Sequence, residues 1–450
     1  MTRETHANTP RRSPFGDATP AFLGASLVGA VVVRLVCMLV ITIRHDVGDE
    51  KGYIDAGLAI ARHATYSAET SAPYLPTAYR PPGYSAFVGG VFAVFGDHVG
   101  AVQVAQILLG LATLLLGVAI AAKVRPGSER FACVLLALNP FDAIYSVVFL
   151  SEGLASFLMM ASAAAFTLLT GARRVVLGAM LLGLLCLVRD IYMAMVLLGA
   201  ATFVVTRGAG TLKASLRLAS LVVVVTALVI APWTARNRAH FGKTIPVSAG
   251  RLGFSLWMGT WARNGDFTMG DAVGARVYPP EAYANESERA LVAEAAKDVG
   301  AAEPIFKRLF VERVKAKPGE VVTTWLVRLP KLWFGTRFDI FEFRNDWFPR
   351  GSPQWIVVKV LLLATNSILV LLAAAGTAFL LWKRQPAAWL SFPLAFTTAA
   401  YLPLNSFENR YSQPTLAFVM ILAAIALHVA VGLVRARGTK LGASPATVTG

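Results

Sequence analysis

The sequence is poor in charged residues, and this scarcity excludes an ordinary soluble domain. Charged side chains make up 15% of the 450 residues and apolar ones 56%, whereas about a quarter of a soluble domain is charged. The mean hydropathy is +0.59. Several uncharged stretches are long enough to cross a bilayer as helices. We therefore predict an integral membrane protein.

Cysteine and histidine are also scarce. The three cysteines, Cys37, Cys133 and Cys186, lie inside apolar runs, where we expect small core residues rather than disulfide partners or metal ligands. The six histidines form no pair at metal-ligand spacing. The first twenty residues are polar, which does not fit a cleavable signal peptide, so the first helix is predicted to be an uncleaved anchor.

Long apolar runs are abundant instead. They predict an all-α, polytopic membrane protein, because a helix satisfies its backbone hydrogen bonds within one segment. About ten transmembrane helices are expected, near residues 21–43, 101–122, 131–149, 153–170, 175–188, 191–206, 215–233, 356–382, 387–403 and 414–434. The shorter, Gly-rich run 83–96 predicts an interfacial or re-entrant helix.

The basic residues concentrate in alternate loops, which predicts the orientation. With the N-terminus in the cytoplasm, the short inner segments hold sixteen Lys or Arg and three acids. The short outer segments hold six Lys or Arg and nine acids. Lys and Arg favour the cytoplasmic side, so we expect a cytoplasmic (inner) membrane protein with both ends in the cytoplasm. The net charge of +16 then reflects topology, and no nucleic-acid partner is expected.

These patterns divide the chain into five parts. The extracytoplasmic segment is expected to contain helices at 285–298 and 304–316, and an amphipathic, Trp-bearing helix at 319–334 that suits the membrane surface. The parts are a cytoplasmic tail (1–20), an N-terminal transmembrane module (21–233) with its first outer loop at 44–100, the extracytoplasmic segment (234–355), C-terminal transmembrane helices (356–434) and a second cytoplasmic tail (435–450).

The first outer loop carries three acids, Asp46, Asp49 and Glu50, near the end of the first helix. A partly desolvated carboxylate there can accept a proton from an attacking hydroxyl. The alternative, with about equal weight, is that all three are solvated loop acids.

Arg80 precedes Pro81 and Pro82, which fix the backbone just before the interfacial segment. Its planar guanidinium suits phosphate oxygens, although a snorkelling Arg anchored to lipid headgroups is the simpler explanation for one such residue. Glu152 follows Ser151 at an outer helix start, where it either caps the helix or faces a cavity.

Two further motifs lie at predicted outer ends of helices. Pro232-Trp233-Thr234 is followed by Arg236 and Asn237, and Arg410-Tyr411 precedes Pro414. Their aromatic residues also fit the interfacial belt of an ordinary membrane protein.

Taken in order, these motifs resemble the GT-C superfamily of membrane glycosyltransferases. The nearest group is similar to glycosyltransferase family 39, with the protein O-mannosyltransferases and the aminoarabinose transferase of lipid A. The match extends from about Asp46 to Pro414. Its elements are Asp49-Glu50 with Tyr53, Arg80-Pro81-Pro82-Gly83-Tyr84, Ser151-Glu152, Pro232-Trp233-Thr234 with Arg236-Asn237, Asn285-Glu286 with Glu288-Arg289, and Arg410-Tyr411 with Pro414.

The resemblance implies a sugar donor carried on a polyprenyl phosphate, an inverting transfer at the outer membrane face, and a lipid, glycan or protein acceptor. It makes Asp49 the catalytic base, with Glu50 shaping the site, and Arg80 the first choice for the donor phosphate. No cofactor is required, although Asp46, Asp49 and Glu50 offer a divalent-metal site as an alternative. The remaining residues expected to bind substrate are Tyr53, Tyr84, Glu152, Arg236, Asn237, Arg410 and Tyr411.

Two other functions fit a membrane protein with charged outer loops. A lipid-linked sugar transporter or flippase needs a cavity and charged groups but no base. A noncatalytic scaffold of envelope assembly needs neither, and the acids of the first outer loop argue weakly against it.

Overall fold

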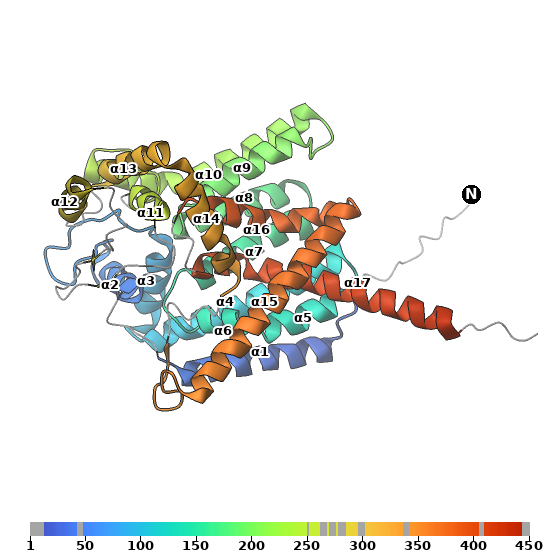
Figure 1. Cartoon of the computed structure of the whole chain (residues 1–450). Helices are drawn as coiled ribbons and strands as arrows, with labels where there is room; N and C mark the ends of the chain where they lie inside the picture. Colours follow the sequence, from blue (N-terminus) through green and yellow to red (C-terminus); the bar gives the residue numbers. More distant parts are fainter. Residues whose placement is uncertain are drawn as a thin grey trace, which may run out of the picture.

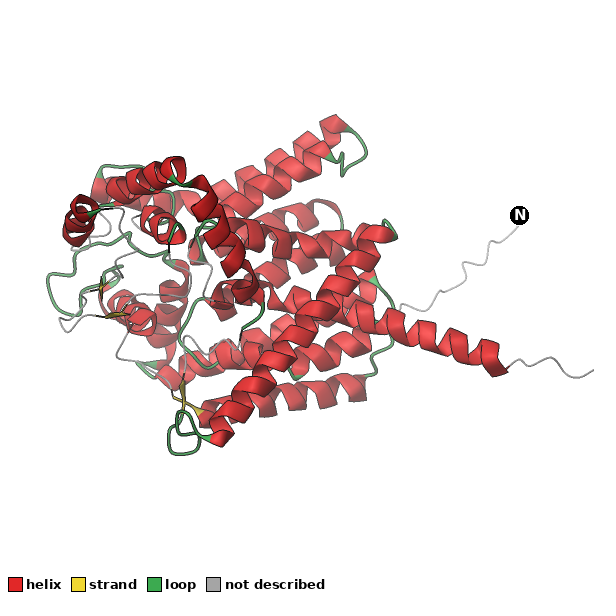
Figure 2. Cartoon of the chain, viewed as in Figure 1, coloured by secondary structure: helices red, strands yellow, loops and turns green. Residues whose placement is uncertain are grey.

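The apolar runs form helices, which dominate the computed structural model of the chain (Figure 2). The structure describes residues 13–42, 48–249, 252–261, 268–269, 276–277, 285–295, 302–335, 342–404 and 409–442. Six described helices are long and apolar enough to cross a membrane, and three apolar helices are shorter. The predicted all-α, polytopic membrane fold is therefore confirmed.

The helices of the first half of the chain are α1 (Pro20–Val40), α2 (Gly48–His63), α3 (Gly83–Phe95), α4 (Val99–Val124), α5 (Glu129–Ala137), α6 (Pro140–Tyr145), α7 (Glu152–Leu168), α8 (Gly171–Val188), α9 (Tyr192–Val205) and α10 (Leu212–Phe241). Those of the second half are α11 (Leu252–Gly259), α12 (Glu286–Ala295), α13 (Glu303–Ala316), α14 (Pro318–Trp333), α15 (Pro353–Trp382), α16 (Phe392–Tyr401) and α17 (Leu416–Gly442), with 3-10 helices η2 (Pro386–Ser391) and η3 (Asn409–Thr415).

Two pairs of very short strands complete the described structure. Strand β1 (Ile41–Thr42) pairs antiparallel with β4 (Glu342–Phe343), and β2 (Thr268–Met269) pairs with β3 (Arg276–Val277). The first pair joins the end of α1 to the segment that leads into α15, so it connects the two transmembrane parts of the chain.

Two predicted helices are wrong as single elements. The run 131–149 is broken into α5 and α6, because Pro140 cannot continue a helix and the Asn139 side chain caps the new one by accepting a hydrogen bond from Phe141 N. The run 387–403 is divided into η2 and α16, with Pro393 at the start of the second helix. The first outer loop also contains a helix, α2, which its weak apolar pattern did not predict.

The helices place the predicted outer segments together. In Figure 1, α2, α3, α11, α12 and α13 gather at one end of the bundle, while α17 extends from the other end, where the turn between α9 and α10 also lies. The helices α11 to α13 have a small apolar core of their own, with Trp257 and Phe306 fully buried. The residues of the first outer loop thus face a separate helical layer.

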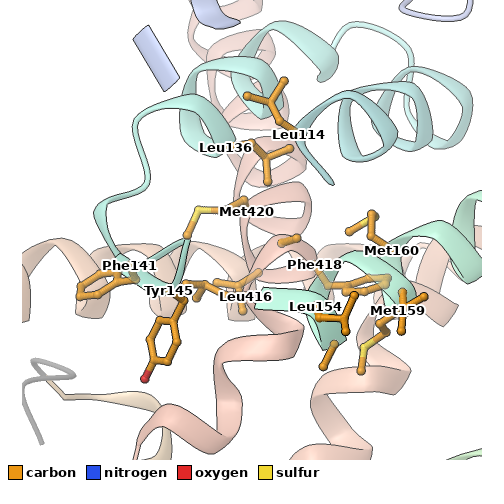
Figure 3. Close-up of a cluster of buried hydrophobic side chains, with 14 of the residues drawn as sticks. Leu114, Leu136, Phe141, Tyr145, Leu154, Met159, Met160, Leu416, Phe418 and Met420 are labelled. Atoms are coloured by element: carbon orange, nitrogen blue, oxygen red, sulfur yellow. The ribbon is translucent and has the colours of Figure 1, made fainter. Parts of the chain in front are cut away.

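The main core lies where α4, α7 and α17 meet. Figure 3 shows Leu114 next to Leu136 in this core, Met420 below them, and Phe418 close to Met159 and Met160. Residues 416–425 of α17 are buried throughout. The three cysteines are buried and free, as predicted.

Candidate active site

Asp49 lies in the first turn of α2 and is held by two guanidinium groups. Its Oδ1 is 2.8 Å from Nη2 of Arg80, and its Oδ2 is 2.9 Å from Nη1 of Arg410. The three side chains keep between 15% and 23% of their surface exposed, so a ligand can reach them. The two positive charges stabilise the ionised carboxylate.

Glycines allow Arg80 to reach Asp49. A Cβ on Gly52 would lie 3.3 Å from Cζ of Arg80, so the guanidinium passes directly over this residue. A Cβ on Gly57 would meet Val88 at 2.7 Å, and one on Gly89 would meet the Gly57 carbonyl at 2.9 Å. The helices α2 and α3 therefore cross in close contact, which sets Asp49 and Arg80 on facing elements.

Tyr53 and Tyr84 lie beside this ion pair. The Arg80 guanidinium stands 5.1 Å from the Tyr53 ring centroid, and the Tyr53 and Tyr84 rings meet edge to face at 4.8 Å. Tyr84 is fully buried and donates a 2.7 Å hydrogen bond to Gln106 on α4. Tyr53 therefore contacts the Arg80 guanidinium, whereas the buried Tyr84 packs against Tyr53.

A second ion pair lies on the other side of Tyr411. Nη1 of Arg189 is 2.8 Å from Glu152, which is nearly fully buried. The Tyr411 ring stacks on Tyr401 at 4.7 Å, with the Arg410 guanidinium 5.2 Å and the Arg189 guanidinium 5.7 Å from its centroid. A continuous row of polar and charged side chains thus extends from the partly exposed Asp49 through Arg410 and Tyr411 to the buried Glu152.

Glu50 is buried, with 7% of its surface exposed. Because it follows Asp49 in the first turn of α2, it is directed away from the position that Asp49 takes between the two guanidinium groups. This placement fits a residue that shapes the site from within rather than one that is open to solvent.

Arg236 and Asn237 bond to backbone groups instead of to the ion pairs. Arg236 donates to the carbonyls of Thr77 (2.7 Å) and Tyr66 (3.2 Å), and Asn237 donates to those of Ile245 (3.0 Å) and Val247 (3.3 Å). The Trp233 indole donates to the Val247 carbonyl as well. These hydrogen bonds therefore hold in place the segment of the first outer loop that leads to Arg80.

Tyr66 connects that chain to Arg80 itself. Its hydroxyl donates a 3.0 Å hydrogen bond to the Arg80 carbonyl. Burial raises the pKa of the Tyr66 phenol, the neighbouring Tyr53 raises it further, and the charges of Arg80 and Arg236 oppose the shift. Tyr66 is consequently a neutral donor that holds the Arg80 backbone.

The other predicted motifs lie apart or outside the described residues. Asn285 caps α12 by accepting a hydrogen bond from Glu288 N, and Glu288 accepts one from the Trp257 indole, so this motif belongs to the α11–α13 layer. Asp46 falls outside the described residues. Within the described part of the chain, no three His, Cys, Asp or Glu side chains are grouped as metal ligands.

Three residues that contribute to the site are not among those predicted from the sequence: Arg189, Tyr401 and Gln106. Arg189 lies at a predicted outer turn between two apolar runs, and a charged residue at such a position often faces the interior of the bundle. The sequence contains no signal for Tyr401 or Gln106, because an aromatic or amide residue in an apolar run does not indicate which side chain it contacts.

Comparison with known proteins gives the fold. No protein family and no curated protein sequence matches the chain. The oligosaccharyltransferase of Archaeoglobus fulgidus in its apo form superimposes with a TM-score of 0.51 at 15% identity, over 95% of this chain and 52% of the archaeal one. The same enzyme tethered to an acceptor peptide with the NVT sequon gives 0.51 at 14% identity, over 96% and 52%.

This chain therefore spans about half the length of the archaeal enzyme. The apo ArnT of Cupriavidus metallidurans is also similar, with a TM-score of 0.42 and 14% identity over 91% of this chain and 78% of ArnT. The chain shares the all-α fold of the archaeal oligosaccharyltransferase structures.

Proposed function

We propose that the protein is an inverting glycosyltransferase that moves a sugar from a polyprenyl-phosphate donor to an acceptor hydroxyl at the outer face of the cytoplasmic membrane. The observation that carries this proposal is the Arg80–Asp49–Arg410 arrangement, in which one partly exposed carboxylate lies between two cations. The GT-C-like fold and the resemblance of the first-loop motif support the same chemistry.

The reaction is a displacement at the anomeric carbon. The acceptor oxygen forms the new bond while the bond from the anomeric carbon to the phosphate oxygen breaks, and the polyprenyl phosphate leaves with the electron pair. Asp49 takes the proton of the acceptor hydroxyl. Arg80 and Arg410 offset the charge that develops on the departing phosphate.

The ion pairs of the free protein suggest how the donor prepares the base. A phosphate competes with the Asp49 carboxylate for the same guanidinium forks, because Arg binds both anions in bidentate fashion. Donor binding then transfers Arg80 and Arg410 from Asp49 to the phosphate, and this leaves the carboxylate oxygens available for the acceptor proton. The site thus keeps its base paired until the leaving group is in position.

Glu152 and Tyr411 are our candidates for contact with the sugar or the acceptor. Arg189 fixes the Glu152 carboxylate at 2.8 Å, and Tyr411 separates that pair from Arg410. A sugar seated between them would meet a carboxylate for its hydroxyls and an aromatic face for its ring. Arg236 and Asn237 serve as positioning residues for the Arg80 segment.

A release assay tests the proposal. Purified full-length protein in detergent is given a polyprenyl-phospho-sugar with and without a mixed lipid and glycan acceptor fraction, and free polyprenyl phosphate is measured. We expect release that requires acceptor and is lost in Asp49→Asn. A transporter or flippase would move the donor across proteoliposomes and release no polyprenyl phosphate, and that result would overturn the proposal.

A further inference from the structure

A large apolar cavity lies inside the bundle, away from the Asp49 site. It has a volume of about 810 Å³, is partly open to the surroundings, and is lined by residues of α7, α8, α9, α10, η2, α16 and α17. Its wall is mostly hydrocarbon and aromatic, with Met159, Phe203, Trp389 and Phe418 among the lining side chains. A volume of this size accommodates a substantial apolar ligand.

Three of the hydroxyl groups in the wall already have hydrogen-bond acceptors within the protein. Ser162 donates to the Gly178 carbonyl, Thr167 to that of Ala163, and Thr206 to that of Thr202. These three groups need no hydrogen-bond partner from a ligand. A hydrocarbon chain can therefore lie against them without leaving a buried donor unpaired. The cavity interior therefore suits lipid chains better than a polar molecule.

Arg174 is the one charged residue among those that line the cavity. It lies in the first turn of α8, is exposed, and has no ion-pair partner within the described chain. Thr206, Gly208 and Pro386 line the same end. A cation where an apolar cavity meets the helix ends matches a molecule with an anionic head and apolar chains.

The surroundings of Arg174 are basic. Arg173 precedes it, and Arg207, Lys213 and Lys383 lie at the neighbouring helix ends. The segments 169–174, 205–217 and 383–386 contain no Asp or Glu. Such clusters between transmembrane helices attract anionic lipid headgroups. Charge complementarity therefore selects an anionic lipid over a neutral one.

The cavity is separate from the proposed active site. Arg174 precedes Arg189, the partner of Glu152, by 15 residues on the same helix, which corresponds to about 22 Å along its axis. The predicted topology places the Arg174 end on the cytoplasmic side. A molecule held there comes from the opposite leaflet to the one that presents the sugar donor.

We propose that this cavity is a binding site for an anionic phospholipid of the surrounding bilayer, with its acyl chains between α7, α9 and α16 and its phosphate at Arg174. The site would anchor the helices around the cavity in the leaflet opposite to the active site. The proposal does not depend on the transferase activity.

Native mass spectrometry of the full-length protein tests the site with defined lipids. Purified protein is delipidated and titrated with phosphatidylglycerol, phosphatidylcholine or a polyprenyl phosphate. We expect phosphatidylglycerol to be retained at one site, with about tenfold weaker retention in Arg174→Ala. Arg173→Ala is the matched control, since the neighbouring cation does not line the cavity, and its loss of retention should be clearly smaller than that of Arg174→Ala.

A variant that fills the cavity tests the binding of the acyl chains independently of the headgroup. A Cβ on Gly199 would lie 3.5 Å from the Phe392 ring, so Gly199→Phe places its ring in the cavity and should abolish retention without changing the gel-filtration profile of the folded protein. Equal retention of phosphatidylcholine, equal behaviour of Arg174→Ala and Arg173→Ala, or Arg174-dependent retention of polyprenyl phosphate alone would overturn the proposal.

Discussion

At the scale of single residues, the question is what Asp49 does between its two cations. Asp49→Asn keeps the shape and most hydrogen bonds but removes the basic oxygen. We expect sugar transfer to fall by roughly 10²–10⁴-fold, the usual contribution of a general base, while donor binding persists. Single-turnover transfer measured beside donor binding separates the two effects.

Asp55→Asn is the control for that variant, because Asp55 lies on the same helix but pairs with Lys51. It should retain near-normal turnover. Full turnover in Asp49→Asn would assign the base elsewhere, and Glu50→Gln and Glu152→Gln are the variants to compare.

Arg80 is the residue expected to hold the donor phosphate. Arg80→Ala removes a charge-assisted contact, which costs about 1.5–3 kcal/mol and should weaken donor binding by about 10–150-fold. Arg80→Lys should recover part of the loss, because it keeps the charge without the bidentate fork. Donor titration by fluorescence or calorimetry measures the change.

Arg62→Ala provides the comparison, since Arg62 belongs to the same outer loop and is paired with Asp97 at the surface. Its donor affinity should equal that of the unmodified protein. An unchanged affinity in Arg80→Ala would transfer the phosphate role to Arg410.

At the scale of elements, α10 holds the segment that presents Arg80. Arg236→Gln keeps hydrogen-bond donors for the Thr77 and Tyr66 carbonyls but removes the charge. If Arg236 positions this segment, the variant should lose less than tenfold in transfer and keep its donor affinity. Arg236→Ala should lower turnover further, because the carbonyls lose their partner. Donor affinity that falls in Arg236→Gln as far as in Arg80→Ala would make Arg236 a phosphate ligand.

The helices α1 and α6 are joined by an ion pair within the apolar bundle. Arg34 is fully buried and pairs with Asp142, while its Nε donates to Ser146. Arg34→Leu leaves the carboxylate without its charge partner, and breaking such a pair destabilises a protein by about 3–5 kcal/mol. We expect a clear loss of thermal stability in detergent.

The double variant Arg34→Leu/Asp142→Leu tests whether the effect arises from the pair. Removing both charges should restore much of the stability, because no unpaired charge remains. A double variant that is less stable than either single one would show that the two residues act independently.

At the scale of the whole molecule, the topology decides whether the site faces the outside. Ser287 is exposed on α12, and a cysteine there should react with an impermeant thiol reagent in intact spheroplasts. Lys213→Cys, at the opposite end of the bundle, should react only after lysis. The native cysteines are all buried, so they give little background. The reverse labelling pattern would contradict the predicted orientation and the placement of the site.

The sequence by itself determined the fold class and most helix positions. Spanning a bilayer depends on local apolar length, and α1, α4, α10 and α15 lie within a few residues of the runs that predicted them, except that α10 continues for about two turns beyond residue 233. The apolar pattern does not predict the breaks at Pro140 and Pro393, because the neighbouring apolar residues outweigh these prolines. The α2 helix was missed for a related reason, since its sequence is polar and its stability comes from packing on α3.

Only the tertiary structure decided which charged residues meet. Asp49 and Arg410 are 361 positions apart, and nothing local distinguishes Arg410 from Arg236 as a partner for an acid in the first loop. In the structure Arg410 pairs with Asp49, whereas Arg236 donates hydrogen bonds to backbone carbonyls. The physical reason is that an ion pair depends on a distance of a few ångströms in space, whereas helix formation in a bilayer depends on a run of neighbouring residues.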